Sequence, residues 1–237
     1  GSISLDIESI QKRLITKIKA AITSNKTNKT RSSYNKSFKS FNKNIKTSDK
    51  CPVIAIGSSS GGPKALKKVL TAFTKDFPAA FIIVQHMPAG FTASLAKHLN
   101  QSCNIQVKEA EEKDPIKKGK ALIAPGDYHM EVNKNQTISL NQEPQKWGVR
   151  PCVDYMMTSA AQVYRKRLIG VILTGMGHDG GRGMQEIKKY NGYGIVEDKS
   201  TALVYGMPST TIEKGAYDEI LPIDQIPQNI MDITERR

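Results

Sequence analysis

The chain lacks any apolar run long enough to cross a bilayer. Its longest such runs, residues 79–84 and 168–173, contain six residues each, whereas a membrane-spanning helix needs about 20. Cysteine is also scarce, and the three residues present, Cys51, Cys103 and Cys152, are an odd number at wide spacing. That pattern fits neither a disulfide framework nor the paired ligands of a zinc site. We therefore expect a protein of the reducing cytoplasm that does not insert into membranes.

Histidine occurs at only four positions, His86, His98, His129 and His178. No two of them have the close spacing of a helical His-x-x-x-His metal pair, so we predict no metal site. Familiar cofactor-binding loops are missing as well. The turn that begins at Gly57 has neither the Gly-x-Gly-x-x-Gly dinucleotide fingerprint nor the Lys-Ser/Thr pair of a P-loop. We accordingly expect no organic cofactor.

Positive charge is abundant but concentrated near the N-terminus. Residues 1–50 contain 12 Lys or Arg against 3 Asp or Glu, a net of +9 out of the +13 of the whole chain. Residues 1–22 open with a Gly-Ser that resembles an expression-tag scar and continue with apolar residues at helical spacing, which predicts an amphipathic helix. Residues 23–50 are rich in Ser, Asn, Thr and Lys and predict a basic flexible linker. Because no folded reader accompanies this segment, we expect no nucleic-acid binding.

From residue 51 to residue 237, short apolar runs alternate with helical patterns. Strands are predicted at 52–57, 80–85, 105–107, 168–173 and 194–197, and helices at 63–73, 91–100, 152–164 and 180–190. Three further runs, at 121–124, 129–132 and 137–140, are separated by turn residues and predict antiparallel strands. The predicted fold class is α/β, a doubly wound, mostly parallel sheet with a small antiparallel hairpin excursion.

Polar, glycine-rich loops follow three of the predicted parallel strands, at residues 57–62, 86–90 and 174–181. Ligands of doubly wound sheets bind beyond the carboxyl ends of the strands, and these ends share one edge of the sheet. The three loops should therefore converge on a single site.

The first loop contains a candidate nucleophile. Its Gly57-x-Ser59-x-Gly61 spacing matches the nucleophile elbow, in which a tight turn between a strand and a helix presents a serine. Free N–H groups at the start of the following helix could stabilise an oxyanion, but they would equally suit a bound phosphate. The spacing leaves both interpretations open, and it selects Ser59 over Ser58 and Ser60 only by its central position.

A nucleophilic serine needs a base, and the base needs an orienting acid. His86 ends the strand predicted beside the serine strand, while His178 in the third loop is the rival base. Asp179 is the only acidic residue in the three loops. It could orient the base or cap the helix predicted to begin near Gly180. The chain order Ser, His, Asp differs from the Ser, Asp, His order of α/β-hydrolases, so a different scaffold is implied.

Four segments resemble the signatures of one known family. They are residues 56–62, 85–92, 124–130 and 170–180, which read IGSSSGG, QHMPAGFT, APGDYHM and GVILTGMGHDG. They are similar to segments of the chemotaxis protein-glutamate methylesterases, the CheB family, and the likeness covers residues 51–237. The resemblance implies a catalytic domain that hydrolyses glutamate methyl esters on bacterial chemoreceptors and resets their signalling, with glutamine deamidation as a further family activity.

The same resemblance implies a role for each site residue. Ser59 would be the nucleophile, His86 the base and Asp179 its orienting acid. The main-chain N–H of Met176 would contribute to an oxyanion hole, and Ser60 and His129 would line the cleft. The chain departs from the family pattern in two places. Serines at 58 and 60 replace Ala and Thr, and His178 replaces Asn beside the acid.

Family likeness also implies partners. Chemoreceptors would be the substrates, and the helix within residues 1–22 resembles the end of an upstream receiver domain. An alternative is a non-catalytic adaptor of the same fold that docks on chemoreceptors or the chemotaxis kinase. Intact Ser59, His86 and Asp179 favour the esterase.

Overall fold

A computed structural model of the chain describes residues 51–236. The helix predicted within residues 1–22 and the linker predicted at 23–50 lie outside the described residues. Residues 51–236 contain a seven-stranded sheet in the order β3-β4-β2-β1-β7-β8-β9, in which every neighbouring pair is parallel. A separate two-stranded antiparallel sheet pairs β5 with β6. The predicted fold class is confirmed.

The central strands of the sheet are apolar up to the last residue of β1 and β2, as expected for strands covered on both faces. Strands β1, β2 and β7 are fully buried. The strands span Val53–Ser58 (β1), Ala80–Gln85 (β2), Gln106–Glu109 (β3), Lys120–Ile123 (β4), His129–Val132 (β5), Ile138–Asn141 (β6), Leu168–Ile172 (β7), Tyr193–Glu197 (β8) and Glu219–Leu221 (β9).

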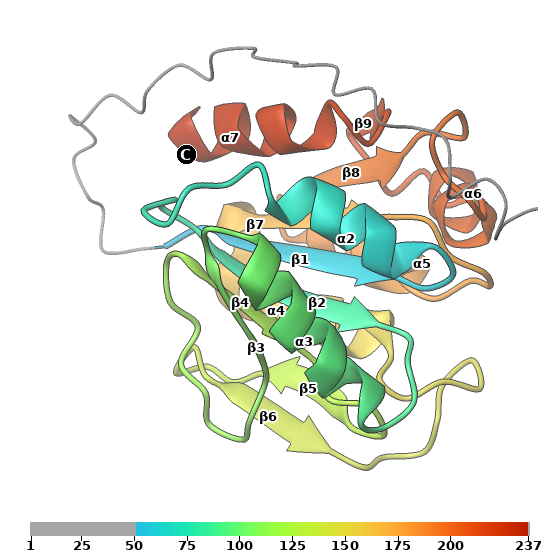
Figure 1. Cartoon of the computed structure of the whole chain (residues 1–237). Helices are drawn as coiled ribbons and strands as arrows, with labels where there is room; N and C mark the ends of the chain where they lie inside the picture. Colours follow the sequence, from blue (N-terminus) through green and yellow to red (C-terminus); the bar gives the residue numbers. More distant parts are fainter. Residues whose placement is uncertain (1–50, 237) are drawn as a thin grey trace, which may run out of the picture. The chain divides into compact units, whose positions relative to one another are not determined.

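Helices cover both faces of the sheet. In Figure 1, α2 and α3 lie in front of the sheet, and α4 and α5 lie behind it. Contacts join α2 to both α3 and α7, whereas α4 packs on α5 and on strand β5 of the hairpin. The helices span Gly62–Leu70 (α2), Phe91–Ser102 (α3), Val153–Tyr164 (α4), Gly181–Lys189 (α5), Gly206–Glu213 (α6) and Ile226–Arg236 (α7), and a 3₁₀ turn covers Arg165–Arg167. No helix within residues 51–236 has the length and apolar character that crossing a bilayer requires.

One predicted strand belongs to a different sheet from the one expected. The run at 121–124 was predicted to be antiparallel, but β4 pairs in parallel with both β2 and β3. Only β5 and β6 form the antiparallel excursion. The turn after β4 leads out of the main sheet into the hairpin, and a short apolar run does not itself reveal the direction of its partner.

Strand register aligns the loops that follow β1, β2 and β7. Ser58 pairs with Gln85, and Gly57 pairs with Ile172. The residues immediately after these three strands therefore emerge at the same level of the same sheet edge, as the sequence predicts.

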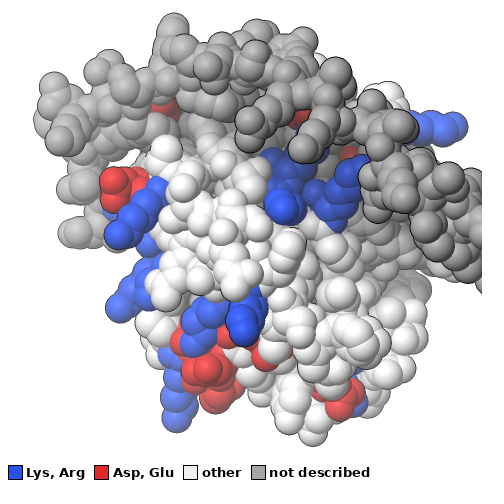
Figure 2. Space-filling view, in the orientation of Figure 1, with Lys and Arg blue, Asp and Glu red and all other residues white. Residues whose placement is uncertain are grey.

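Charged side chains are interspersed on the face shown in Figure 2. Lys and Arg occur there in separate groups between uncharged residues, some beside Asp and Glu. The visible described surface of this face thus carries no continuous basic stripe of the kind that follows a nucleic-acid backbone.

Candidate active site

The three serines at the end of β1 have different surroundings. Ser58 is fully buried, and its hydroxyl donates a 2.7 Å hydrogen bond to Gln85 Oε1. Ser59 is half-buried and Ser60 is exposed. The Ser58 hydroxyl is thus committed to the interior, which leaves Ser59 and Ser60 on the accessible side of the turn.

Hydrogen bonds from two other strand ends hold the serine turn. Gln85 Nε2 donates to the Ser59 carbonyl at 2.9 Å, and the Ser59 N–H donates to the Thr174 carbonyl at 3.0 Å. The Thr174 hydroxyl donates to the Ser60 carbonyl at 2.9 Å. Gly61 has φ +85°, a left-handed conformation that glycine adopts without strain as the chain enters α2. The turn is therefore fixed from both neighbouring strands.

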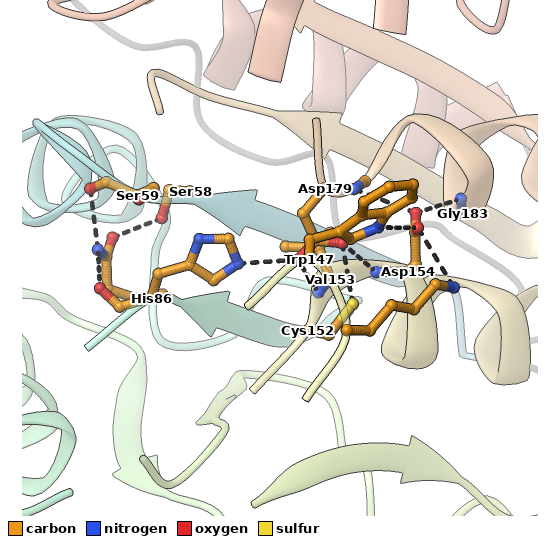
Figure 3. Close-up of polar contacts among 12 residues, drawn as sticks. Ser58, Ser59, His86, Trp147, Cys152, Val153, Asp154, Asp179 and Gly183 are labelled. Atoms are coloured by element: carbon orange, nitrogen blue, oxygen red, sulfur yellow. Dashed lines mark hydrogen bonds and ion pairs between the residues drawn. The ribbon is translucent and has the colours of Figure 1, made fainter. Parts of the chain in front are cut away.

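His86 contacts Asp179 directly. Its Nε2 lies 2.8 Å from Asp179 Oδ2, and the two side chains are only 10% and 2% exposed. The main-chain N–H of His86 also donates to the Ser58 carbonyl at 3.1 Å, which ties the base candidate to the serine strand. In Figure 3 the His86 ring lies between the serine turn and Asp179. Within residues 51–236, no hydrogen bond joins Ser59 Oγ to the ring.

The Asp179 carboxylate is also bonded to the start of helix α4. Oδ2 accepts the Val153 N–H at 2.6 Å, and Oδ1 accepts the Asp154 N–H at 2.9 Å and the Cys152 thiol at 3.0 Å. The N-terminus of a helix carries a partial positive charge and unsatisfied N–H donors, so it stabilises an anion. Asp179 therefore both orients His86 and caps a helix.

That capping differs from the one expected from the sequence. Asp179 was weighed as a cap for the helix that follows it, yet it caps α4. The start of α5 is capped instead by Asp154, whose Oδ1 accepts the N–H groups of Gly180 at 3.1 Å and Gly183 at 2.8 Å. Asp179, which precedes α5, thus caps α4, and Asp154, which lies in α4, caps α5, because the two helices begin side by side.

Ionisation at this site follows from burial and partners. Burial opposes the charge of Asp179, but the hydrogen bond and charge of His86, with the Cys152 and Val153 donors, hold the pKa of the carboxyl below its ordinary value. Burial first, and then the negative charge of Asp179, raise the pKa of the Cys152 thiol. Cys152 therefore stays protonated and donates to Asp179.

Met176 lies in the loop between β7 and α5, beside the serine turn. No acceptor within residues 51–236 bonds to its main-chain N–H, while the N–H of neighbouring Gly175 donates to the Val204 carbonyl. A Cβ built on Gly175 would lie 2.9 Å from Ser59 Cβ, so this loop passes directly against the candidate nucleophile. The Met176 N–H is available to an anion there.

The other two histidines near the site lie apart from the His86–Asp179 pair. His129 was expected to line the cleft, but its ring is fully buried, stacks on Tyr155 and bonds through Nε2 to the Pro144 carbonyl. Burial lowers its pKa. His178, the rival base, is exposed and bonds to the Thr210 hydroxyl instead of to Asp179.

Glu197 is a buried residue that sequence reasoning missed. At the end of β8, its Oε2 accepts the Thr174 N–H at 2.8 Å and its Oε1 accepts the Thr201 hydroxyl at 3.0 Å. Burial raises its pKa. It supports Thr174, which in turn holds the serine turn. An acid at the end of an apolar strand is the signal that could have found it.

Three buried side chains bring possible metal ligands together. Atoms of Cys152, Asp154 and Asp179 lie within 4.8 Å of one another. Their carboxylate oxygens already accept N–H groups from two helix starts, whose positive ends would repel a cation. The geometry thus fits paired helix caps better than a metal centre.

The rim of the site carries apolar side chains. The large hydrophobic side chains exposed within residues 51–236 all lie in segments that follow strands β2, β4, β6, β7 and β8: Phe91, Tyr128, Trp147, Met176 and Leu203. Two recesses in the surface lie elsewhere. One of about 410 Å³ is at the opposite ends of β3 and β4, and one of about 210 Å³ is beside Tyr155; Ser59 borders neither.

Comparisons with known proteins agree in naming one family. The sequence model of the CheB methylesterase family matches residues 54–230. The protein-glutamate methylesterase/protein-glutamine glutaminase of Pyrococcus horikoshii is 41% identical over 99% of this chain and 65% of its own length. Its counterpart of the same name in Clostridium acetobutylicum is 44% identical over 79% of this chain and 54% of its own length. The chain spans less than two thirds of either relative.

A solved structure is similar over most of the described residues. The crystal structure of the Thermotoga maritima CheB methylesterase catalytic domain matches with a TM-score of 0.75 and 41% sequence identity. The match covers 77% of this chain and 98% of that domain. The fold is thus shared with a solved relative.

Proposed function

Since the chain belongs to the CheB methylesterase family, we propose that residues 51–237 form a serine esterase domain that hydrolyses glutamate methyl esters, and deamidates glutamines, on chemoreceptors. Ser59 is the nucleophile, His86 the base and Asp179 the orienting acid. The observation that carries the proposal is the buried 2.8 Å contact between His86 and Asp179. His86 comes immediately after β2, and Ser59 comes immediately after β1, the strand that pairs with β2.

The contact of His86 Nε2 with Asp179 supports one direction of proton transfer. His86 Nε2–H donates a hydrogen bond to Asp179 Oδ2, which leaves Nδ1 as the basic nitrogen for the serine. Ser59 Oγ attacks the ester carbonyl as Nδ1 takes its proton, and Nδ1 then returns that proton to the departing methoxide, which leaves as methanol. Water hydrolyses the acyl-enzyme by the same two proton transfers, and with a glutamine side chain the leaving group is ammonia.

Closure of the Ser59–His86 hydrogen bond belongs to the substrate complex. Catalytic hydrogen bonds are often long in the free enzyme and tighten when substrate binds. The oxyanion that forms on the attacked carbonyl is stabilised by the Met176 N–H. The charge of Asp179 stabilises the His86 imidazolium while the proton is held.

The apolar rim supports a protein as the substrate. Met176 and Leu203 are exposed beside the serine turn: Met176 follows Gly175, whose ideal Cβ would lie 2.9 Å from Ser59 Cβ, and a Cβ on Gly61 would lie 2.9 Å from Leu203 Cβ. Such a rim suits the apolar flank of a polypeptide that presents one esterified side chain to Ser59.

Methanol release from methylated receptor membranes tests the proposal. The purified chain should release methanol, and Ser59→Ala should abolish the release while keeping the thermal unfolding midpoint. Ser60→Ala is the matched control, because Ser60 is the exposed neighbour in the same turn. Full activity in Ser59→Ala, or its loss in Ser60→Ala alone, would contradict the assignment of the nucleophile.

A second pair of variants tests the base. His86→Gln should abolish methanol release, whereas His178→Asn should retain it, because His178 bonds to Thr210 and not to the acid. The reverse ranking would exchange their roles. If the wild-type chain binds receptor membranes without releasing methanol, the adaptor alternative replaces the esterase.

A further inference from the structure

Asp154 is a buried carboxylate that the proposed reaction does not use. It is fully buried in the first turn of α4. Its Oδ1 accepts the N–H groups of Gly180 and Gly183, and its Oδ2 accepts the indole N–H of Trp147 at 3.0 Å and lies 3.4 Å from Lys146 Nζ. A buried charge is costly unless it is paired and hydrogen-bonded, and each oxygen of Asp154 has such partners.

The position of Asp154 couples it to the orienting acid. Asp154 fixes the N–H of Gly180, the residue immediately after Asp179, while Asp179 accepts the N–H of Asp154 itself. The two aspartates therefore hold each other's main chain. Helix α5 also approaches α4 closely here, since a Cβ built on Gly183 would lie 2.6 Å from Met157 Cβ. Little space is left for the loop to shift while both caps are intact.

We propose that Asp154 is a positioning residue: by capping α5 it holds the loop that carries Asp179, so that Asp179 Oδ2 meets His86 Nε2. This inference rests on the proposed function of the His86–Asp179 pair. Without the cap, the N–H groups of Gly180 and Gly183 lose their acceptor, and the start of α5 can move. Movement at Gly180 transfers directly to its neighbour Asp179, and the loss falls on the chemical step because Asp179 acts there through His86.

Asparagine and alanine separate the cap from the charge. In Asp154→Asn the amide oxygen can still accept from Gly180 and Gly183, although its NH₂ group then faces the Trp147 N–H. In Asp154→Ala no acceptor remains. We expect Asp154→Ala to lower kcat by roughly 10- to 100-fold with KM within about twofold of wild type. Asp154→Asn should restore most of kcat.

A signal that does not depend on substrate reports the same contact. The His86 Nε2 proton, donated to a carboxylate, should give a downfield proton NMR resonance in the wild type and in Asp154→Asn. It should be lost or broadened in Asp154→Ala. Ile230→Ala controls for general destabilisation, because Ile230 is buried in α7 away from this loop. That variant should lower the thermal unfolding midpoint but keep kcat and the resonance.

Several results would overturn the positioning role. Wild-type kcat and an unchanged resonance in folded Asp154→Ala would do so, as would equal losses in the asparagine and alanine variants. If the alanine variant does not fold, Asp154→Glu decides, since its longer side chain displaces the two N–H groups while keeping the charge; a wild-type kcat there also contradicts the role. An inactive wild type that shows the expected resonance pattern would instead contradict the proposed function alone.

Discussion

Replacement of Gly175 by alanine should displace Ser59, the proposed nucleophile. An ideal Cβ at Gly175 would lie 2.9 Å from Ser59 Cβ and would also overlap Met207 Sδ. Carbon atoms in ordinary contact stay about 3.5–4.0 Å apart. Ser59 must therefore move away by roughly 0.6–1 Å if the loop itself holds its place. Main-chain hydrogen bonds join Gly175 to Val204 and to Met207 and hold the loop in place, so we expect the serine turn to move.

The cost of that displacement can be estimated from the chemistry. A shift of about 1 Å in a reacting group can lower the rate on the order of 100-fold. We expect Gly175→Ala to lower kcat for methanol release by roughly 10- to 100-fold. An extra methyl group in a packed region also destabilises the fold by about 1–3 kcal/mol. Steady-state kinetics and thermal unfolding of the same preparation measure the two effects.

A second glycine provides the control. A Cβ at Gly170, within β7, would lie 2.5 Å from both Ile187 Cδ1 and Met184 Sδ, so Gly170→Ala overpacks the core without touching Ser59. Its thermal unfolding midpoint should fall as in Gly175→Ala, but its kcat should stay near wild type at a temperature where it is folded. An unchanged kcat in Gly175→Ala, or equal losses in both variants, would refute the reasoning.

Three other perturbations have defined outcomes. Thr174→Val should lower stability by about 1–3 kcal/mol and lower kcat, because it leaves the Ser60 carbonyl and the Val204 N–H unpaired. Thr174→Ser keeps the hydroxyl and should restore the stability, measured by denaturation, and kcat, measured by methanol release. Ser58→Ala should destabilise the chain by about 1–2 kcal/mol, since Gln85 loses a buried partner, whereas Ser60→Ala should not; chemical denaturation of the two variants tests this. The pKa of Asp179 is below its ordinary value in the folded state, so its contribution to stability is complete above the unfolded pKa of about 3.9 and is lost as pH falls through the folded pKa. The stability difference between wild type and Asp179→Asn should therefore narrow in denaturation curves as the pH falls below about 4, and a constant difference would contradict this.

Much of the sheet could be predicted because its strands are short, apolar and separated by turns. The strands at 80–85 and 129–132 have the predicted bounds, and the helix predicted at 152–164 begins one residue later. The pairing of β4 could not be predicted, because an apolar run of four residues has the same pattern in parallel and antiparallel sheets. Strand β9 and helices α6 and α7 were not anticipated, and β9 has only three half-buried residues.

The site was predictable where its residues follow strands. Ser59 and His86 each follow a strand in one parallel pair, so register alone brings them together. Helix capping was not predictable in the same way. Local spacing suggested that Asp179 caps the next helix, but the partner it caps lies 26 residues earlier. The burial of His129 likewise depends on stacking against Tyr155, a contact that no local pattern encodes.

Trp147 gives the site an optical signal of its own. It is the sole tryptophan in the chain, so the indole fluorescence of the unlabelled protein comes from one known place. The ring is half-exposed at the rim, lies 5.2 Å from the Arg182 guanidinium and donates its N–H to Asp154. A partner that covers the rim, or a change that separates the indole from Asp154, alters the polarity around the ring. Emission wavelength and quenching can therefore follow both docking at the rim and the integrity of the paired helix caps beneath it, in real time and without a dye.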